Sequence, residues 1–132
     1  MNKRKIRDIG RLTFSLLFFG LYIPHIFLYL FKNSLRKSIN ADLERRKEKN
    51  EVRMNKCLMF LYYIHTDRYF RNLFYHRVGA VVGALIGWWR LGDRSFVISK
   101  TTKIGEGAYF AHPFACEINA KSIGKNFSCR HL

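Results

Sequence analysis

The feature that most constrains the fold is a six-residue spacing of apolar residues that begins near Phe96. An α-helix repeats every 3.6 residues and does not sustain such a period. A hexapeptide period fits a triangular parallel β-helix, in which the inward apolar side chains fill the prism. A sandwich of short strands, which alternates with period two, fits less well. The recurring positions, with one step of seven, are Ile98, Ile104, Phe110, Cys116, Ile123 and Cys129.

The N-terminal part contains an uncharged run, Leu12 to Phe31, whose 20 residues would just cross a hydrocarbon core if helical. We expect Pro24 to break this helix, and His25 is costly to place in lipid. We predict a kinked segment that contacts the cytoplasmic side of the membrane, with an ordinary span or a buried core helix as alternatives. Basic residues on both sides leave the orientation open: Lys3, Arg4, Lys5, Arg7, Arg11, Lys32, Arg36 and Lys37.

The middle of the chain predicts helices. Residues 38–56 carry charges of both signs, which indicates a solvated helix with Asp42 and Arg46 paired at i,i+4. Residues 57–79 place apolar side chains at helical spacing, and we expect one or two helices packed on the C-terminal part or on the membrane. The glycines in GAVVGALIG, 79–87, lie four apart and permit close approach of another helix.

The polar stretch LGDRS, 91–95, is the best boundary between the helical part and the repeats. We therefore divide the chain into a membrane segment (1–37), a helical region (38–95) and the hexapeptide repeats (96–132).

Composition limits the classes of ligand. The net charge of +15 predicts salt-sensitive association with nucleic acid but no sequence preference, because phosphate neutralisation reads no bases. A dedicated nucleic-acid-binding module is the least favoured function. The three cysteines, Cys57, Cys116 and Cys129, form no C-x-x-C pair, so neither a zinc site nor a redox motif is indicated.

The stretches IGEGAYFAHPF and SIGKNFSC, with RNLFYHRVG upstream, resemble the serine acetyltransferase-like hexapeptide transferases over roughly residues 60–132. The resemblance implies an α+β chain in which membrane-associated and amphipathic helices precede the first coils of a left-handed parallel β-helix. It also implies transfer of acetyl from acetyl-CoA to a hydroxyl, on serine or on a sugar, without a metal. Full-length members imply a homotrimer.

Two site residues follow from the resemblance. A histidine at the position of His112 acts as general base on the acceptor hydroxyl, and Asp67 matches an acid that binds the acceptor. The chain departs from the pattern at Ala111, where an acid is usual, and at Arg68, where Pro is frequent. A corner histidine without a role and an aspartate that caps a helix are the structural alternatives.

Length is a further departure from the family. Residues 96–132 amount to about two coils, whereas family members continue through further coils that bind CoA. We therefore expect an enzyme whose site is incomplete within these residues. A non-catalytic membrane-bound remnant or scaffold is the alternative function.

Overall fold

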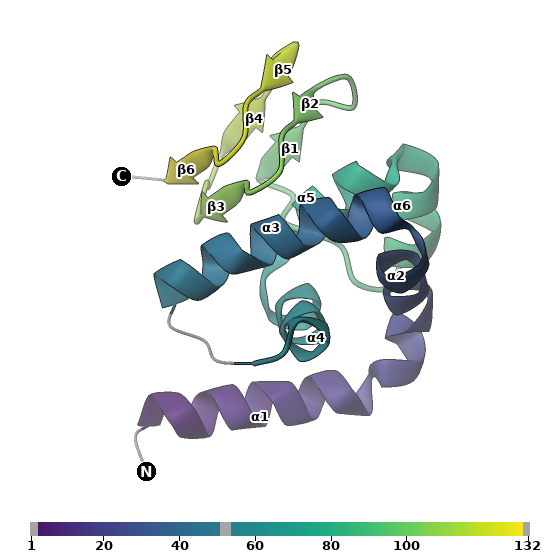
Figure 1. The fold of residues 1–132 in the computed structure, drawn as a ribbon, viewed down its shortest axis with the longest axis vertical. Helices are drawn as coiled ribbons and strands as arrows, with labels where there is room; N and C mark the ends of the chain where they lie inside the picture. The colour runs from purple at the N-terminus through teal and green to yellow at the C-terminus, as the bar shows by residue number, and fades with distance from the viewer. Residues whose placement is uncertain (1–2, 51–53, 131–132) are drawn as a thin grey trace.

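The computed structural model describes residues 3–50 and 54–130, which form an α+β fold (Figure 1). Its helices come first in the chain: α1 (Lys3–Leu17), α2 (Phe19–Phe31), α3 (Asn33–Asn50), α4 (Lys56–Thr66), α5 (Arg68–Val78) and α6 (Ala80–Gly87). Short strands follow: β1 (Phe96–Ile98), β2 (Lys103–Ile104), β3 (Tyr109–Ala111), β4 (Cys116–Ile118), β5 (Ser122–Ile123) and β6 (Ser128–Arg130). Figure 1 shows the strands gathered at one end of the molecule, above α3, with α4 between α3 and α1.

The strands form three parallel pairs, β1 with β4, β2 with β5 and β3 with β6. Phe110 of β3 lies opposite Cys129 of β6 in the register of the last pair. Each strand has only two or three residues, so each pair is a very short ladder.

The predicted left-handed parallel β-helix over 96–132 is wrong. The described residues form six helices and three two-stranded pairs, and a helix closes the apolar face of the strands. Tyr69 and Leu73 of α5 share one buried cluster with Phe96, Ala108 and Phe110. The six-residue period identifies apolar positions, but a period along the chain does not determine which element covers them.

The apolar N-terminal run also differs from the prediction. No single helix among residues 3–50 and 54–130 is long and apolar enough to cross a membrane, although α1 and α2 together pass that test by length and composition. The two helices meet at 88°, and the bend lies at Phe18. The expected break at Pro24 is wrong, because α2 continues through this residue.

Helix α2 buries its polar residues against the other helices. His25 is fully buried, with its Nε2 3.2 Å from the hydroxyl of Tyr75, and the hydroxyl of Tyr22 lies 2.8 Å from Nδ1 of His65. Burial lowers the pKa of both His25 and His65 to about 4, so both rings are neutral near pH 7. The histidine that would be costly in lipid is therefore enclosed by protein.

The spacing of the glycines in α6 serves a close approach to α5. A Cβ at Gly83 would lie 2.9 Å from the carbonyl oxygen of Tyr75, and a Cβ at Gly87 would lie 2.7 Å from its ring. The opposite face of α6 leaves Val81 and Leu85 exposed.

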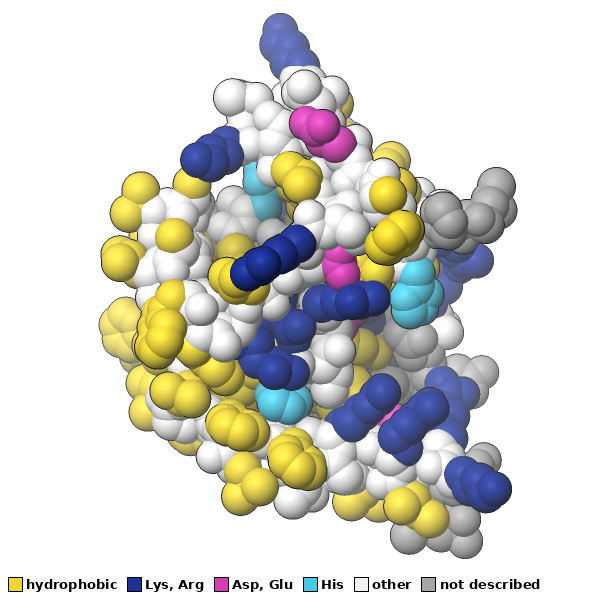
Figure 2. Space-filling view, turned by 180° about the vertical axis from the view of Figure 1, so that it is seen from behind, with side chains coloured by type: hydrophobic (Ala, Val, Ile, Leu, Met, Phe, Trp, Pro, Cys, Tyr) yellow, Lys and Arg dark blue, Asp and Glu magenta, His cyan; other side chains and the backbone are white. Residues whose placement is uncertain are grey.

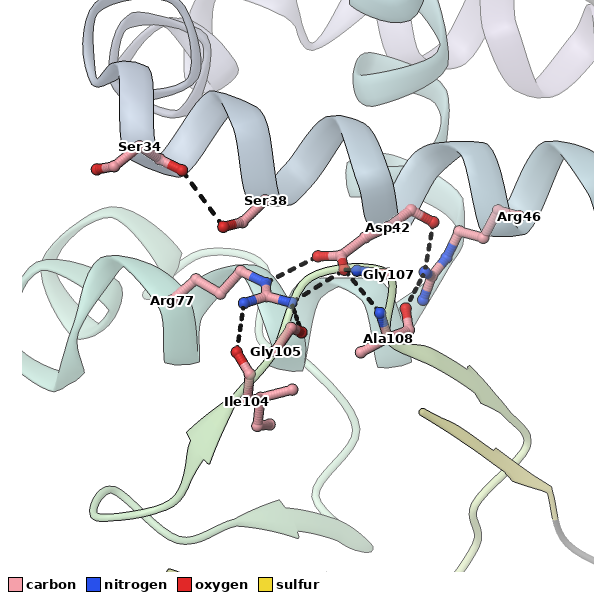
Figure 3. A network of polar contacts seen from close by, with 9 residues as sticks. All are labelled: Ser34, Ser38, Asp42, Arg46, Arg77, Ile104, Gly105, Gly107 and Ala108. Carbon is pink, nitrogen blue, oxygen red and sulfur yellow. Dashed lines mark hydrogen bonds and ion pairs between the residues drawn. The ribbon is translucent and has the colours of Figure 1, made fainter. Parts of the chain in front are cut away.

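Helix α3 is solvated on one side only, because its Leu35, Ile39 and Leu43 are buried. The predicted pairing of the Asp42 and Arg46 side chains is wrong. The Asp42 carboxylate instead accepts hydrogen bonds from Arg77, from Nε at 2.8 Å and from Nη2 at 2.9 Å (Figure 3).

The Asp42 carboxylate also holds the chain between β2 and β3. Its Oδ1 accepts from the backbone N–H groups of Gly107 and Ala108, both at 2.9 Å. Arg77 donates in turn to the carbonyls of Ile104 at 3.0 Å and Gly105 at 2.8 Å. One buried ion pair thus joins α3, α5 and the strand region.

We expect Asp42→Ala to lower the free energy of unfolding by about 3–5 kcal/mol, because it leaves the buried Arg77 guanidinium and two N–H groups without their acceptor. Glu48 is on the same helix, and its exposed pairing with Arg45 makes Glu48→Ala the matched control, with an expected change below about 0.5 kcal/mol. Urea unfolding measures both. Equal stability of the two variants would contradict the anchoring role of Asp42.

Candidate functional site

A pocket of about 390 Å³ lies where α1, the end of α4, the start of α5 and β3 meet. His112 and Asp67, which the sequence singled out, both line it although they are far apart in the chain. The lining residues are Arg4, Arg7, Asp8, Arg11, Tyr62, Tyr63, Thr66, Asp67, Arg68, Tyr69, Arg71, Tyr109, Phe110, Ala111 and His112.

His112 follows β3 directly and starts a tight turn. Its φ of 52° lies in the left-handed region, which is uncommon for residues other than glycine. The ring is exposed and meets the ring of Tyr69 edge-on, with 5.9 Å between centroids. Among the described residues, no carboxylate forms a hydrogen bond to it. Within the described residues, the imidazole thus contacts the ring of Tyr69 without an orienting carboxylate.

Asp67 links α4 to α5 and caps α5. Its Oδ1 accepts hydrogen bonds from the N–H groups of Tyr69 and Phe70, both at 2.9 Å. Its Oδ2 accepts from Nε of Arg46 at 3.2 Å. The carboxylate is part of the pocket wall and also caps α5. The alternative given for Asp67, an aspartate that caps a helix, therefore describes its observed contacts.

Arg46 is a buried cation behind that wall. Its guanidinium lies 4.7 Å from the ring centre of Phe70 and 5.4 Å from that of Tyr109. Its Nη1 also donates to the carbonyl of Ala108 at 3.3 Å. Aromatic faces and a carboxylate together compensate this charge, and the same contacts connect α3 to both sides of the pocket.

The pocket has a strongly basic lining that the sequence analysis did not assign to a site. Arg4, Arg7 and Arg11 lie at i, i+3 and i+7 of α1 and so share one face of that helix. Their charge alone predicts the flank of a membrane segment, whereas their helical spacing is the signal for a common face. Figure 2 shows Lys and Arg side chains gathered over the middle and lower parts of one face of the molecule.

Two arginines of α5 complete the lining and have defined contacts. Arg71 donates to the carbonyls of His65 at 2.7 Å, Ile64 at 3.0 Å and Leu91 at 3.0 Å. Arg68 pairs with Asp93, with Nε 2.9 Å from Oδ2. The pocket thus places the imidazole of His112 beside several positive charges. Within the described residues, no cluster of His, Cys, Asp and Glu is suited to hold a metal ion.

Comparison of the chain with protein-family models, curated proteins and solved structures finds no match. The function is therefore inferred from the site itself and from the resemblance described above.

We expect Asp67→Ala to destabilise the chain by more than the roughly 0.5–2 kcal/mol of an ordinary lost cap, because Arg46 also loses its carboxylate partner. Asp67→Asn keeps an oxygen that can accept from the N–H groups of α5, so its unfolding free energy should lie between those of Asp67→Ala and the parent.

Glu106→Gln is the control for this series, since it removes the charge of a half-buried carboxylate that contacts the exposed Lys125. Urea unfolding midpoints rank the four proteins. A fully stable Asp67→Ala would show that the cap carries no stability and would leave binding as the role of this residue.

Proposed function

We propose that the chain acts in O-acetyl transfer from acetyl-CoA to a hydroxyl acceptor, serine or a sugar, with His112 as the general base. The observation that carries the proposal is the placement of His112 and Asp67 on one pocket of about 390 Å³. Pockets of this volume suit small molecules. The proposal does not depend on a β-helix, because helices α1, α4 and α5 build most of the pocket wall.

The chemistry needs one proton acceptor near the hydroxyl. Imidazole nitrogen takes the hydroxyl proton while the oxygen attacks the thioester carbonyl of acetyl-CoA. The tetrahedral intermediate then releases the thiolate, which receives the proton from the imidazolium and leaves as free CoA. Imidazole suits both transfers near neutral pH. The exposed position of His112 at the rim leaves it open to a donor that approaches from solvent.

We predict that His112→Asn lowers kcat by about 10²–10⁴-fold and leaves the KM for acetyl-CoA within about twofold, because the base acts on the acceptor in the transition state. Asn is chosen because it tolerates the left-handed backbone better than Ala. The control is Ala115→Gly, which alters another left-handed position (φ 52°) outside the pocket lining.

Release of free CoA thiol is followed with serine and with a panel of sugars. The assay uses the natural product of the gene, including any residues that its reading frame places after Leu132. Parent-like turnover of His112→Asn would show that the histidine only shapes the turn. An inactive parent with every acceptor would contradict acetyl transfer and favour the scaffold alternative.

We also propose that the chain binds the cytoplasmic surface of the membrane without relying on a spanning helix. Large apolar side chains are exposed on the helices, and Figure 2 shows hydrophobic side chains along one edge of the molecule. Soluble monomers rarely expose a large continuous apolar patch. The most exposed of these residues are Leu17 (73%), Phe31 (72%), Val81 (74%), Leu85 (70%) and Trp88 (73%).

We expect the chain to float with vesicles of phosphatidylglycerol and phosphatidylcholine. Replacing both Leu85 and Trp88 by Ser should weaken this binding about a hundredfold, because burial of each side chain contributes about 1.5 kcal/mol, or about tenfold in affinity. Val97→Ser is the control, since it removes an exposed apolar side chain from β1. A chain that stays at the bottom of the gradient with anionic vesicles would contradict the proposal.

A further inference from the structure

We infer that the pocket at His112 takes an acceptor that carries a phosphate group, an inference that rests on the proposed function for its reaction and on the pocket for its ligand. Five arginines line the pocket, against two aspartates. Guanidinium groups bind phosphate through paired N–H donors, which gives both charge and direction. A phosphate in this pocket places the rest of a small acceptor within the same cavity as the imidazole.

The two acids of the lining already have partners. Asp67 accepts from Arg46 and from two N–H groups of α5. Asp8 accepts from the hydroxyl of Tyr62, with 3.2 Å between the oxygens. One of the five arginines, Arg68, is paired with Asp93, and the other four still outnumber the two acids, whose acceptor capacity is in part used elsewhere.

The positive charges are only partly neutralised by protein. The hydrogen bonds of Arg71 go to three neutral carbonyls, and Arg7 and Arg11 are exposed on α1. Burial, and after it the nearby Arg90, lowers the pKa of the Arg71 guanidinium. A bound anion would offset the repulsion between the Arg71 and Arg90 guanidinium groups. A dianionic phosphate would do so more effectively than the single carboxylate of serine.

The phosphate has two sources that share this chemistry. One is a soluble phosphate monoester such as a sugar phosphate. The other is the headgroup of an anionic lipid, because α1 carries exposed Ile6, Ile9 and Leu16 on the face away from its arginines.

The test measures binding by calorimetry to glucose 6-phosphate and glycerol 3-phosphate, with glucose and glycerol as neutral probes. We expect the phosphates to bind and the neutral compounds to bind at least tenfold more weakly. The double variant Arg7→Gln, Arg11→Gln should weaken phosphate binding at least tenfold. Lys3→Gln with Lys5→Gln removes the same charge from the same helix but outside the pocket lining, and it should stay within about twofold of the parent.

Vesicles separate the two sources. Binding of the soluble phosphates identifies a small-molecule acceptor. Binding to phosphatidic acid vesicles alone, lost in the arginine variant and kept in the lysine variant, identifies a lipid headgroup. Equal binding by the arginine and lysine variants, or no preference for phosphate in any arm, overturns the inference.

The inference and the proposed function fail separately. If the parent acetylates neutral acceptors but shows no arginine-dependent binding of phosphate, the proposed reaction is supported and the phosphate inference is overturned. If the chain binds phosphate through Arg7 and Arg11 but transfers no acetyl group, the phosphate site is supported and the proposed reaction is contradicted.

Discussion

A single buried carboxylate holds the two halves of this chain together. Asp42 is fully buried, and it accepts from the Arg77 guanidinium and from two N–H groups of the turn before β3. A buried charge is tolerated only when its hydrogen-bonding capacity is satisfied, so the three segments must come together to make it stable. The position of β3, and with it the turn at His112, follows from this ion pair.

A second ionic connection gives the pocket its wall. Arg46, one turn beyond Asp42 on α3, contacts the carbonyl of Ala108 on one side and the carboxylate of Asp67 on the other. Asp67 in turn fixes the first turn of α5. His112 at the rim and Asp67 in the wall are thus tied to one helix, although neither lies on it. Rigid support of this kind is what a general base needs to stay near its substrate.

Sequence reasoning succeeded where interactions are local and failed where they are not. Helical spacing over 57–79 matches α4 and α5, and a cap at Asp67 requires only its own neighbours. The pairing of Asp42 with Arg77 crosses the fold, whereas i,i+4 spacing alone predicts the nearer Arg46 as the partner. The hexads of the C-terminal part mark apolar positions but do not reveal that α5 covers them. Charge counting assigned Arg7 to a membrane flank, whereas the angular position of this residue on α1 places it in the pocket.

The amphipathic character of α1 connects the pocket to the proposed membrane contact. Ile6 and Ile9 lie on the exposed face of the helix, and Arg7 and Arg11 lie on the face that lines the pocket. A helix with its side chains is about 10–12 Å across, so the arginines of a helix resting on a bilayer sit only that far above the apolar boundary. This height exceeds the Debye length of about 8 Å at physiological salt, so the attraction between these arginines and anionic headgroups is partly screened and depends on ionic strength. The proposed membrane contact and the proposed recognition of phosphate therefore both involve α1.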